Sequence, residues 1–282
     1  MNRKVNRLSA MLSTKDIQQL SLPRGHGRIP SLTRIRRRGR PVHAAREYLA
    51  MPHVPYPPPS AARAAVALLL HQAARAGLDQ LPQGSNPPPP TAPLALLAQT
   101  IAGCTGCRLA SGRQQTVPGE GPPKARLMVI GEGPGAEEDR TGRPFVGAAG
   151  QLLDRILQNG MGLTREQVFI ANVLKCRPPG NRDPEPDEVV ACQPFLEAQI
   201  LAVEPELLLA LGRHAAHALL ESQASLQSLR GRVHTRPRSN QRVLVTYHPA
   251  YLLRNPAAKK DCWQDIQIGL DFLGLSKPPT RS

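Results

Sequence analysis

Four short, continuously apolar runs constrain the fold of this chain more than any other feature of its sequence. Each is bounded by Gly, Pro or charged residues: 126–131 (RLMVIG), 168–174 (VFIANVL), 207–212 (LLLALG) and 242–247 (RVLVTY). Unbroken hydrophobicity over so few residues predicts strands that are buried on both faces. Helical patterns lie between and after these runs, at 147–160, 186–203, 213–220 and 259–273. This alternation predicts an α/β fold, a three-layer α/β/α sandwich with a central four-stranded parallel sheet.

Charge and composition divide the 282 residues into unequal parts. Residues 1–59 are predicted to be a disordered basic tail that contains prolines, and residues 60–93 a helix followed by a Pro-rich linker. A compact domain is expected at 94–275, with a short tail at 276–282. Of the formal net charge of +15, residues 1–60 carry +10, so the remainder is only mildly basic. That balance is compatible with a polyanionic partner and does not identify one.

The sequence predicts neither a membrane span nor a secretory signal. Its apolar runs are all shorter than the roughly eighteen residues that a spanning helix needs. The first residues also lack an apolar segment followed by a small-residue cleavage site. We therefore expect a monomeric cytoplasmic protein, associated with the nucleoid if DNA is its partner.

The cysteines are spaced as metal ligands are. Cys104 and Cys107 form a C-x2-C pair at the start of the predicted domain, Cys176 follows the second apolar run, and Cys192 lies in the next helical pattern. A disulfide framework is not expected in a cytoplasmic chain of this size. One C-x2-C pair and two distant cysteines can form a four-thiolate site for zinc or for an iron–sulfur cluster, and thiolate chemistry accepts both. The alternative is a redox C-x2-C pair and two buried structural thiols.

The fifth cysteine, Cys262, fits a different pattern. It shares one helical face with Ile266, Leu270 and Leu273, at spacings of four, eight and eleven residues. That face is typical of a core helix, so Cys262 is predicted to be a small buried hydrophobic residue rather than a ligand.

Ligands of parallel α/β folds bind beyond the carboxyl ends of the strands, so the residues there are candidates for a functional site. The first run leads into a Gly/Pro-rich loop that contains Glu132, Gly133 and Glu138. Phe145, in the same polar loop, is either a hydrophobic plug or a stacking platform for a planar ligand. Asn172 lies inside the second apolar run, where an amide is costly to bury without partners. Its donor and acceptor together could read the edge of a base.

The fourth run ends at His248, and the following proline turns the chain sharply, so the imidazole is expected to project at the strand end. Its alternative is a purely structural hydrogen bond. Leu252 and Arg254 follow closely, in an apolar stretch that would be unusual on a solvent loop. An apolar side chain next to a cation suits a wedge that enters DNA beside a phosphate contact.

Several motifs of this chain, in order, resemble those of the family 4 uracil-DNA glycosylases of bacteria and archaea. They are GEGPGAEED (131–139), TGRPFVGAAGQLLD (141–154), NVLKCRPPGNR (172–182) and HPAYLLR (248–254). Cys104, Cys107, Cys176 and Cys192 match the cluster ligands of the family in type, order and spacing. The resemblance covers about residues 95–275. It implies hydrolysis of the N-glycosidic bond of uracil in single- or double-stranded DNA, and a structural [4Fe–4S] cluster held by the four cysteines.

The resemblance also implies roles for the site residues. Phe145 would stack on the flipped uracil, Asn172 would bind its pyrimidine edge, and Glu132 and Gly133 would shape the pocket. His248 would stabilise negative charge that develops on uracil O2. Leu252 would fill the gap left in the duplex, and Arg254 would contact a phosphate. Glu132 and Glu138 are both candidates to position the attacking water.

Two other functions are compatible with the residues alone. One is a zinc-binding nucleic-acid module without catalysis, because four thiolates and a basic charge would suit it. The other is an α/β enzyme that acts on free nucleotides. The colour of the protein separates the first from an iron–sulfur enzyme, and competition between dUMP and a uracil-containing oligonucleotide separates the second.

Overall fold

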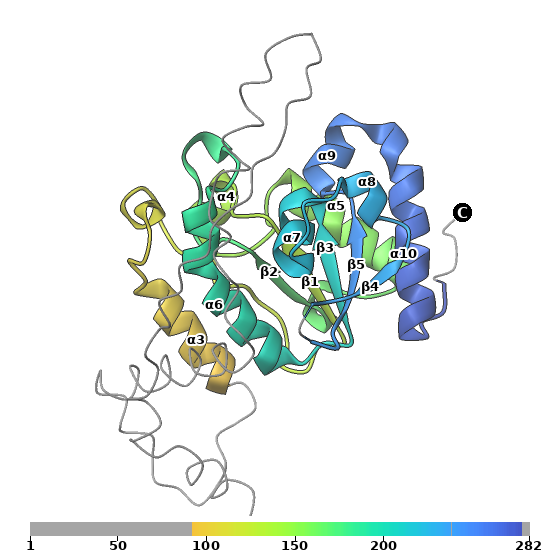
Figure 1. Ribbon diagram of the computed structural model, residues 1–282, viewed down its shortest axis with the longest axis horizontal. Coiled ribbons are helices and arrows are strands. Elements are labelled where there is room, and N and C mark those ends of the chain that lie inside the picture. The colour runs from red at the N-terminus through yellow and green to blue at the C-terminus, as the bar shows by residue number, and fades with distance from the viewer. Residues whose placement is uncertain (1–91, 238, 278–282) are drawn as a thin grey trace, which may run out of the picture. The chain divides into compact units, whose positions relative to one another are not determined.

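The computed structural model describes residues 92–237 and 239–277 (Figure 1). The predicted basic tail, all but the last two residues of the 60–93 segment, and most of the 276–282 tail lie outside the described residues. Within the described ranges, no helix is long and apolar enough to cross a membrane.

A five-stranded sheet forms the centre of the domain. Its strands are β1 (Leu127–Gly131), β2 (Phe169–Asn172), β3 (Leu207–Leu211), β4 (Val233–Thr235) and β5 (Arg242–Thr246). They lie in the order β2-β1-β3-β5-β4, and all neighbouring pairs are parallel except β4 with β5. Since β1 lies between β2 and β3, the chain leaves β1 toward one side of the sheet and later returns to its other side. The predicted α/β/α class is confirmed.

The predicted number of strands was wrong by one. The additional strand, β4, pairs antiparallel with β5 at the sheet edge, where Val233 lies opposite Leu244. It has only three residues, and none of them is fully buried. The search for continuous apolar runs finds strands covered on both faces, so it does not detect a short, partly exposed edge strand.

The helices cover both faces of the sheet. They are α3 (Ala92–Ala102), α4 (Ala136–Thr141), α5 (Ala148–Arg155), α6 (Pro186–Val203), α7 (Gly212–Leu220), α8 (Leu226–Leu229), α9 (Pro249–Arg254) and α10 (Lys259–Leu273). A π-helical turn, Ile156–Met161, continues α5. Short 3₁₀ turns lie at Arg108–Ser111, Arg165–Gln167, Pro179–Asn181 and Pro256–Ala258.

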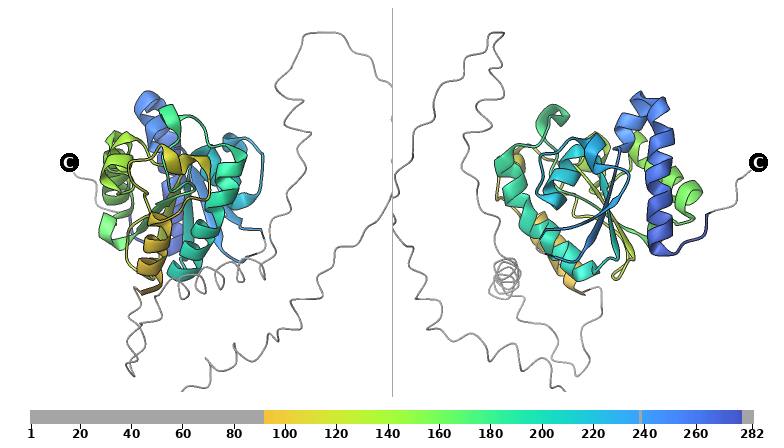
Figure 2. Two further views of the ribbon diagram at one scale, coloured as in Figure 1. Left: turned by 90° about the vertical axis from the view of Figure 1, so that its left-hand side faces the viewer. Right: turned by 45° about the vertical axis from the view of Figure 1, so that its right-hand side comes forward.

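Alternate residues of each central strand enter two different cores, which explains their continuous hydrophobicity. Met128 and Ile130 pack with residues of α6 and α7 on one face, while Leu127 and Val129 pack with residues of α5 and α10 on the other. Figure 2 shows the sheet between these two helical layers. Cys262 lies buried in the second core with Ile266, Leu270 and Leu273, as predicted from their spacing.

Candidate active site

A pocket of about 390 Å³ lies at the carboxyl ends of the parallel strands. Glu132 follows β1, Asn172 ends β2, and His248 follows β5; all three line the pocket, together with Phe145. From β1 the chain continues to β2 on one side of the sheet and then to β3 on the other. Doubly wound folds bind their ligands at the carboxyl ends of the strands at such a point. The structure therefore brings these four predicted residues together.

Phe145 and Asn172 converge above Gly131, the last residue of β1. A Cβ atom at Gly131 would lie 2.4 Å from Asn172 Oδ1 and 2.5 Å from Phe145 Cζ, so only glycine leaves room for both side chains. Asn172 is 1% exposed, and its Oδ1 has no hydrogen-bond partner among the described residues. An unpaired buried carbonyl oxygen costs about 1–3 kcal/mol. Its position beside an aromatic ring fits a planar ligand that carries an N–H donor.

Two contacts hold the loop of Phe145 in a backbone conformation with φ of +52°. Arg165 donates hydrogen bonds to the carbonyl oxygens of Pro144 and Phe145, the latter at 2.9 Å. Gly150 lies beneath the loop, where a Cβ would come within 1.9 Å of Phe145 O. A left-handed backbone at a bulky residue persists only when its surroundings impose it. Arg165 is a positioning residue that sequence reasoning missed, because it belongs to no motif.

Glu138 holds the same loop from the other side. One carboxylate oxygen accepts hydrogen bonds from the backbone N–H of Val146 (2.9 Å) and Gly147 (3.0 Å), and the other accepts from Gly135 N–H (3.1 Å). The side chain is buried. Since both oxygens bind backbone donors, this arrangement favours a structural role for Glu138 over the positioning of a water molecule.

His248 is held as a neutral imidazole. It caps the N-terminus of α9, and its Nδ1 accepts a hydrogen bond from Ala250 N–H at 3.2 Å. Burial lowers the pKa of His248 to about 4, with a further lowering by Arg254 and an opposing effect of Glu138. With Nδ1 acting as acceptor, the proton of the neutral ring is on Nε2. The ring centroid lies 5.7 Å from that of Phe145, so this donor belongs to the same site.

Glu132 lies beside two residues that sequence reasoning missed, Asp183 and His214. His214 Nε2 is 3.8 Å from Glu132 Oε2 and 3.4 Å from Asp183 Oδ2, and Arg213 pairs with Asp183 at 2.9 Å. Burial raises the pKa of Glu132 to about 7; Asp183 raises it further and Arg213 opposes this. His214 follows the end of β3, so the same strand-end rule that identified the other residues could have found it.

Gly133 lies on the same wall of the pocket. A Cβ there would lie 3.4 Å from Leu174 Cβ, in ordinary contact distance, so the residue leaves a small open volume beside Leu174. Its backbone, not a side chain, therefore forms this part of the wall.

The predicted wedge, Leu252, was assigned to the wrong side of α9. Leu252 is 1% exposed and packs in the core between the sheet and α10, whereas Tyr251 and Leu253 are 39% and 42% exposed. The reason is helical phase: Leu252 N–H donates to His248 O, so Leu252 lies one turn beyond a residue that already faces the interior. Tyr251 lines the active-site pocket instead, stacked on Tyr247 at a centroid distance of 5.0 Å. Arg254 also lines that pocket.

The four predicted ligand cysteines lie in one region beside the pocket. Cys176 and Cys192 are buried in a cluster with Leu109 and Leu174, and Cys107 packs against it. Burial raises the pKa of the Cys176 thiol, with smaller contributions from Cys107 and Cys104. It raises the pKa of Cys192 to about 11.

Hydrogen-bond donors face two of these sulfur atoms. Arg113 Nη1 lies 3.3 Å from Cys176 Sγ, and Gly106 N–H lies 3.4 Å from Cys104 Sγ. Such donors stabilise a thiolate more than a thiol, while burial alone opposes ionisation. A bound metal centre would offset that burial cost, so the donor set fits a four-thiolate centre.

One segment links the cysteine site to the pocket. Cys176 is only four residues beyond Asn172, and between them Lys175 is fully buried. Lys175 Nζ donates to Asn172 O at 2.6 Å and to Gln199 Oε1 at 2.7 Å. The position of Asn172 therefore depends on the segment that ends at Cys176.

The sequence of the chain is similar to those of known proteins. Residues 118–267 match the family model of the uracil DNA glycosylase superfamily. The type-4 uracil-DNA glycosylase of Saccharolobus solfataricus is 44% identical over 193 residues, which cover 66% of this chain and 89% of that protein. That of Thermotoga maritima is 44% identical over 186 residues, 64% of this chain and 94% of that protein. The type-5 uracil-DNA glycosylase of Thermus thermophilus is 32% identical over 184 residues, 53% of this chain and 84% of that protein.

The α/β fold with a pocket at its strand ends, the matching family model and the relatives covered over most of their length define the class. The chain belongs to the uracil-DNA glycosylase superfamily. Its higher identity to the type-4 enzymes than to the type-5 enzyme confirms the predicted resemblance to family 4.

Proposed function

We propose that Phe145, Asn172 and His248 carry out the reaction of this uracil-DNA glycosylase. The enzyme hydrolyses the N-glycosidic bond of uracil in DNA and leaves an abasic site. The observation that supports this assignment most is the unpaired, buried Asn172 Oδ1 beside the ring of Phe145. A uracil base would supply both a planar face and a ring N–H donor.

Recognition requires that the base leave the helix, because the pocket cannot reach it inside the stack. The flipped uracil lies against Phe145, where stacking contributes about 1–3 kcal/mol. Asn172 accepts from the ring N–H and donates to a neighbouring carbonyl oxygen of the pyrimidine. Backbone atoms at Gly133, together with Glu132, form the wall that excludes the methyl group of thymine.

His248 acts on the leaving base. As the bond breaks, negative charge develops on uracil O2, and the neutral Nε2–H donates to it. A donor preorganised in this way typically contributes about 3 kcal/mol. The low pKa of His248, about 4, keeps the ring neutral at physiological pH, and its Nε2–H is available as a donor without uptake of a proton from solvent.

Glu132 is the candidate that positions water, since the oxygens of Glu138 bind backbone donors. Its carboxyl is partly exposed to the pocket, and its pKa of about 7 gives an ionised form at neutral and higher pH. In that form it accepts a hydrogen bond from water and directs it toward the sugar, on which positive charge develops.

DNA contacts are assigned to α9. Arg254 at the pocket rim is placed to pair with a phosphate, in either single- or double-stranded DNA. The exposed ring of Tyr251 takes the place that we predicted for Leu252 and meets the stack next to the lesion. Its partner Tyr247 is itself covered by the guanidinium of Arg230, 4.0 Å from the ring centroid.

Cys104, Cys107, Cys176 and Cys192 are assigned as the ligands of a [4Fe–4S] cluster. The support is the donor set: four thiols in one region, two of them buried, with donors facing two sulfur atoms. When bound, the cluster would cross-link the segments that carry these cysteines, and hydrolysis would need no electron transfer from it. Broad visible absorption in anaerobically purified protein would support it, and a colourless zinc protein would contradict it.

The decisive experiment uses the full chain and oligonucleotides with a single uracil, single- and double-stranded. Alkali after incubation reveals abasic sites. We expect excision from both substrates, with no effect of excess dUMP, because a free nucleotide lacks the flanking phosphates. Asn172→Ala should weaken capture of the base as well as slow cleavage.

His248→Ala should lower the single-turnover rate about a hundredfold or more, with DNA affinity nearly unchanged. His217→Ala is the matched control, because His217 is a half-buried histidine of α7 that does not line the pocket. Wild-type rates in both His248→Ala and Asn172→Ala would contradict these roles.

A further inference from the structure

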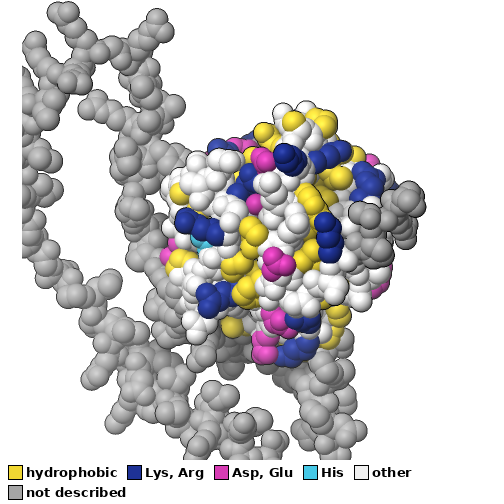
Figure 3. Space-filling model, turned by 90° about the vertical axis from the view of Figure 1, so that its right-hand side faces the viewer, with side chains coloured by type: hydrophobic (Ala, Val, Ile, Leu, Met, Phe, Trp, Pro, Cys, Tyr) yellow, Lys and Arg dark blue, Asp and Glu magenta, His cyan; other side chains and the backbone are white. Residues whose placement is uncertain are grey.

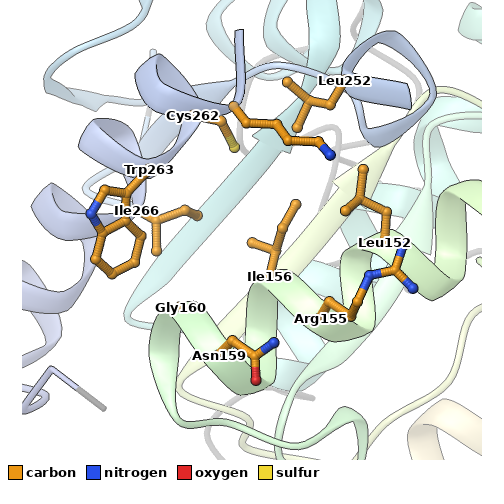
Figure 4. Close-up of a pocket in the computed structure, with 10 residues that line it drawn as sticks. Leu152, Arg155, Ile156, Asn159, Gly160, Leu252, Cys262, Trp263 and Ile266 are labelled. Atoms are coloured by element: carbon orange, nitrogen blue, oxygen red, sulfur yellow. The ribbon is translucent and has the colours of Figure 1, made fainter. Parts of the chain in front are cut away.

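A second pocket, of about 310 Å³, lies between α10, α9 and the helix formed by α5 and its π-helical turn. None of its lining residues lines the active-site pocket. Its apolar floor is formed by Leu152, Ile156, Leu252, Cys262, Trp263 and Ile266. Figure 4 shows these side chains on the three helical segments, around the space between them. The uracil reaction assigns nothing to this pocket.

A π-helical turn forms one wall of the pocket. Ile156–Met161 follows α5 directly, and π turns are wider than α-helical turns and are often found at functional sites. Gly160 lies in this turn opposite α10, and a Cβ there would lie 3.4 Å from both Trp263 and Ile266. Because position 160 carries no side chain, the turn contributes only the side chains of Ile156 and Asn159 to the lining, and a larger residue at 160 would press on Trp263 and Ile266.

Two cations of the lining are available for a ligand. Arg155 and Lys259 are exposed, and neither forms an ion pair within the described residues. The acidic residues within two positions of them in the chain pair with other cations: Asp154 lies 3.1 Å from Arg165, and Asp261 lies 3.7 Å from Arg230. Figure 3 shows hydrophobic side chains bordered by Lys and Arg on the face that carries α10.

We propose that this pocket binds an acidic peptide segment of a partner protein. An aromatic or branched aliphatic side chain of the segment would fill the apolar floor, and its carboxylates would pair with Arg155 and Lys259. A buried apolar anchor with charged groups around it is the usual arrangement of a peptide-binding hot spot. A DNA backbone fits less well, because phosphates and sugars offer no apolar group for a floor that includes Trp263 and Ile266.

The test measures binding of a labelled probe to the full-length chain. The probe is a fluorescein-labelled peptide of four Asp residues followed by Leu-Phe, and its control replaces Leu-Phe by Ser-Ser. We expect saturable binding of the first peptide in fluorescence anisotropy and about tenfold weaker binding of the second. Arg155→Glu and Lys259→Glu should each weaken binding by about tenfold or more, whereas Lys260→Glu, the next residue on α10, should change it by less than about threefold.

Two further measurements separate this pocket from the active site and from DNA binding. Gly160→Leu should fill the gap and abolish peptide binding, while uracil excision in Arg155→Glu should remain at the wild-type rate. The proposal is overturned if the Leu-Phe peptide shows no saturable binding, or if Lys260→Glu weakens it as much as Lys259→Glu. It is also overturned if the Arg155 and Lys259 variants lose affinity for an oligonucleotide and not for the peptide.

Discussion

The contact between Phe145, Asn172 and Gly131 makes a sharp prediction for the variant Gly131→Ala. The new methyl carbon would lie 2.4 Å from Asn172 Oδ1 and 2.5 Å from Phe145 Cζ. Contacts of about 3.4 Å or more are ordinary, so both side chains must withdraw by roughly 1 Å. The backbone at this position pairs in register with Asn172 of β2, so the strand itself cannot move aside.

The magnitude follows from the two contacts that are displaced. Loss of base stacking costs about 1–3 kcal/mol. Misplacement of one buried hydrogen-bonding amide costs about 1–2 kcal/mol. Together these raise the activation free energy by about 2–5 kcal/mol. This lowers kcat/KM by a factor between about thirty and several thousand. Crowding of the core costs stability by about 1–3 kcal/mol in addition, so the protein should still fold.

The assay is single-turnover release of uracil from a fluorescent oligonucleotide, with the enzyme in excess but below saturation so that the rate reports kcat/KM, at a temperature well below Tm. The control is Gly112→Ala, because Gly112 is exposed, has a negative φ and has open space around a Cβ. Near-wild-type excision by folded Gly131→Ala would refute the assignment of the base site to this point of the sheet.

Three further predictions concern the pH dependence, the cysteines and α9. Burial raises the pKa of Glu132 to about 7, so its carboxylate forms as the pH rises through that value. Excision should then increase between about pH 6 and about pH 8, and Glu132→Gln should be slow and nearly pH-independent; an unchanged profile would exclude Glu132 as the water-positioning group. Cys176→Ala should be colourless and poorly folded, while Cys262→Ala should stay brown and active, and the opposite pattern would disprove the ligand assignment. Tyr251→Ala should slow excision from duplex more than from single-stranded DNA, whereas Leu252→Ala should lower the free energy of unfolding by about 2–5 kcal/mol; equal effects of Tyr251→Ala on both substrates would argue against a wedge.

The fold was predictable because its central strands are buried on both faces. Each of the four apolar runs became a strand, since only a covered parallel sheet accommodates unbroken hydrophobicity. The edge strand β4 was not predicted, because its three partly exposed residues form no continuous apolar run. The π-helical turn after Arg155 was not predicted either, since the apolar spacing of 147–160 is compatible with an uninterrupted α-helix.

The site residues were predictable where a polar side chain lies at the end of a predicted strand. Asn172 and His248 are polar residues at the ends of apolar runs, so the strand-end rule selected them. Leu252 was misassigned because its direction depends on the phase of α9, which is set by the cap at His248 and not by composition. Arg165 was missed because it acts on backbone carbonyls from a distant turn, and such contacts have no sequence motif.

The short span between Asn172 and Cys176 has a consequence for how this enzyme fails. If the cysteines hold a cluster, an oxidant that destroys it would release the segment that fixes the side-chain amide of Asn172, and the packing around Cys176 and Cys192 would loosen with it. The damaged molecule would then lose its affinity for uracil together with its local fold. It would stop excising uracil and would not begin to excise other bases.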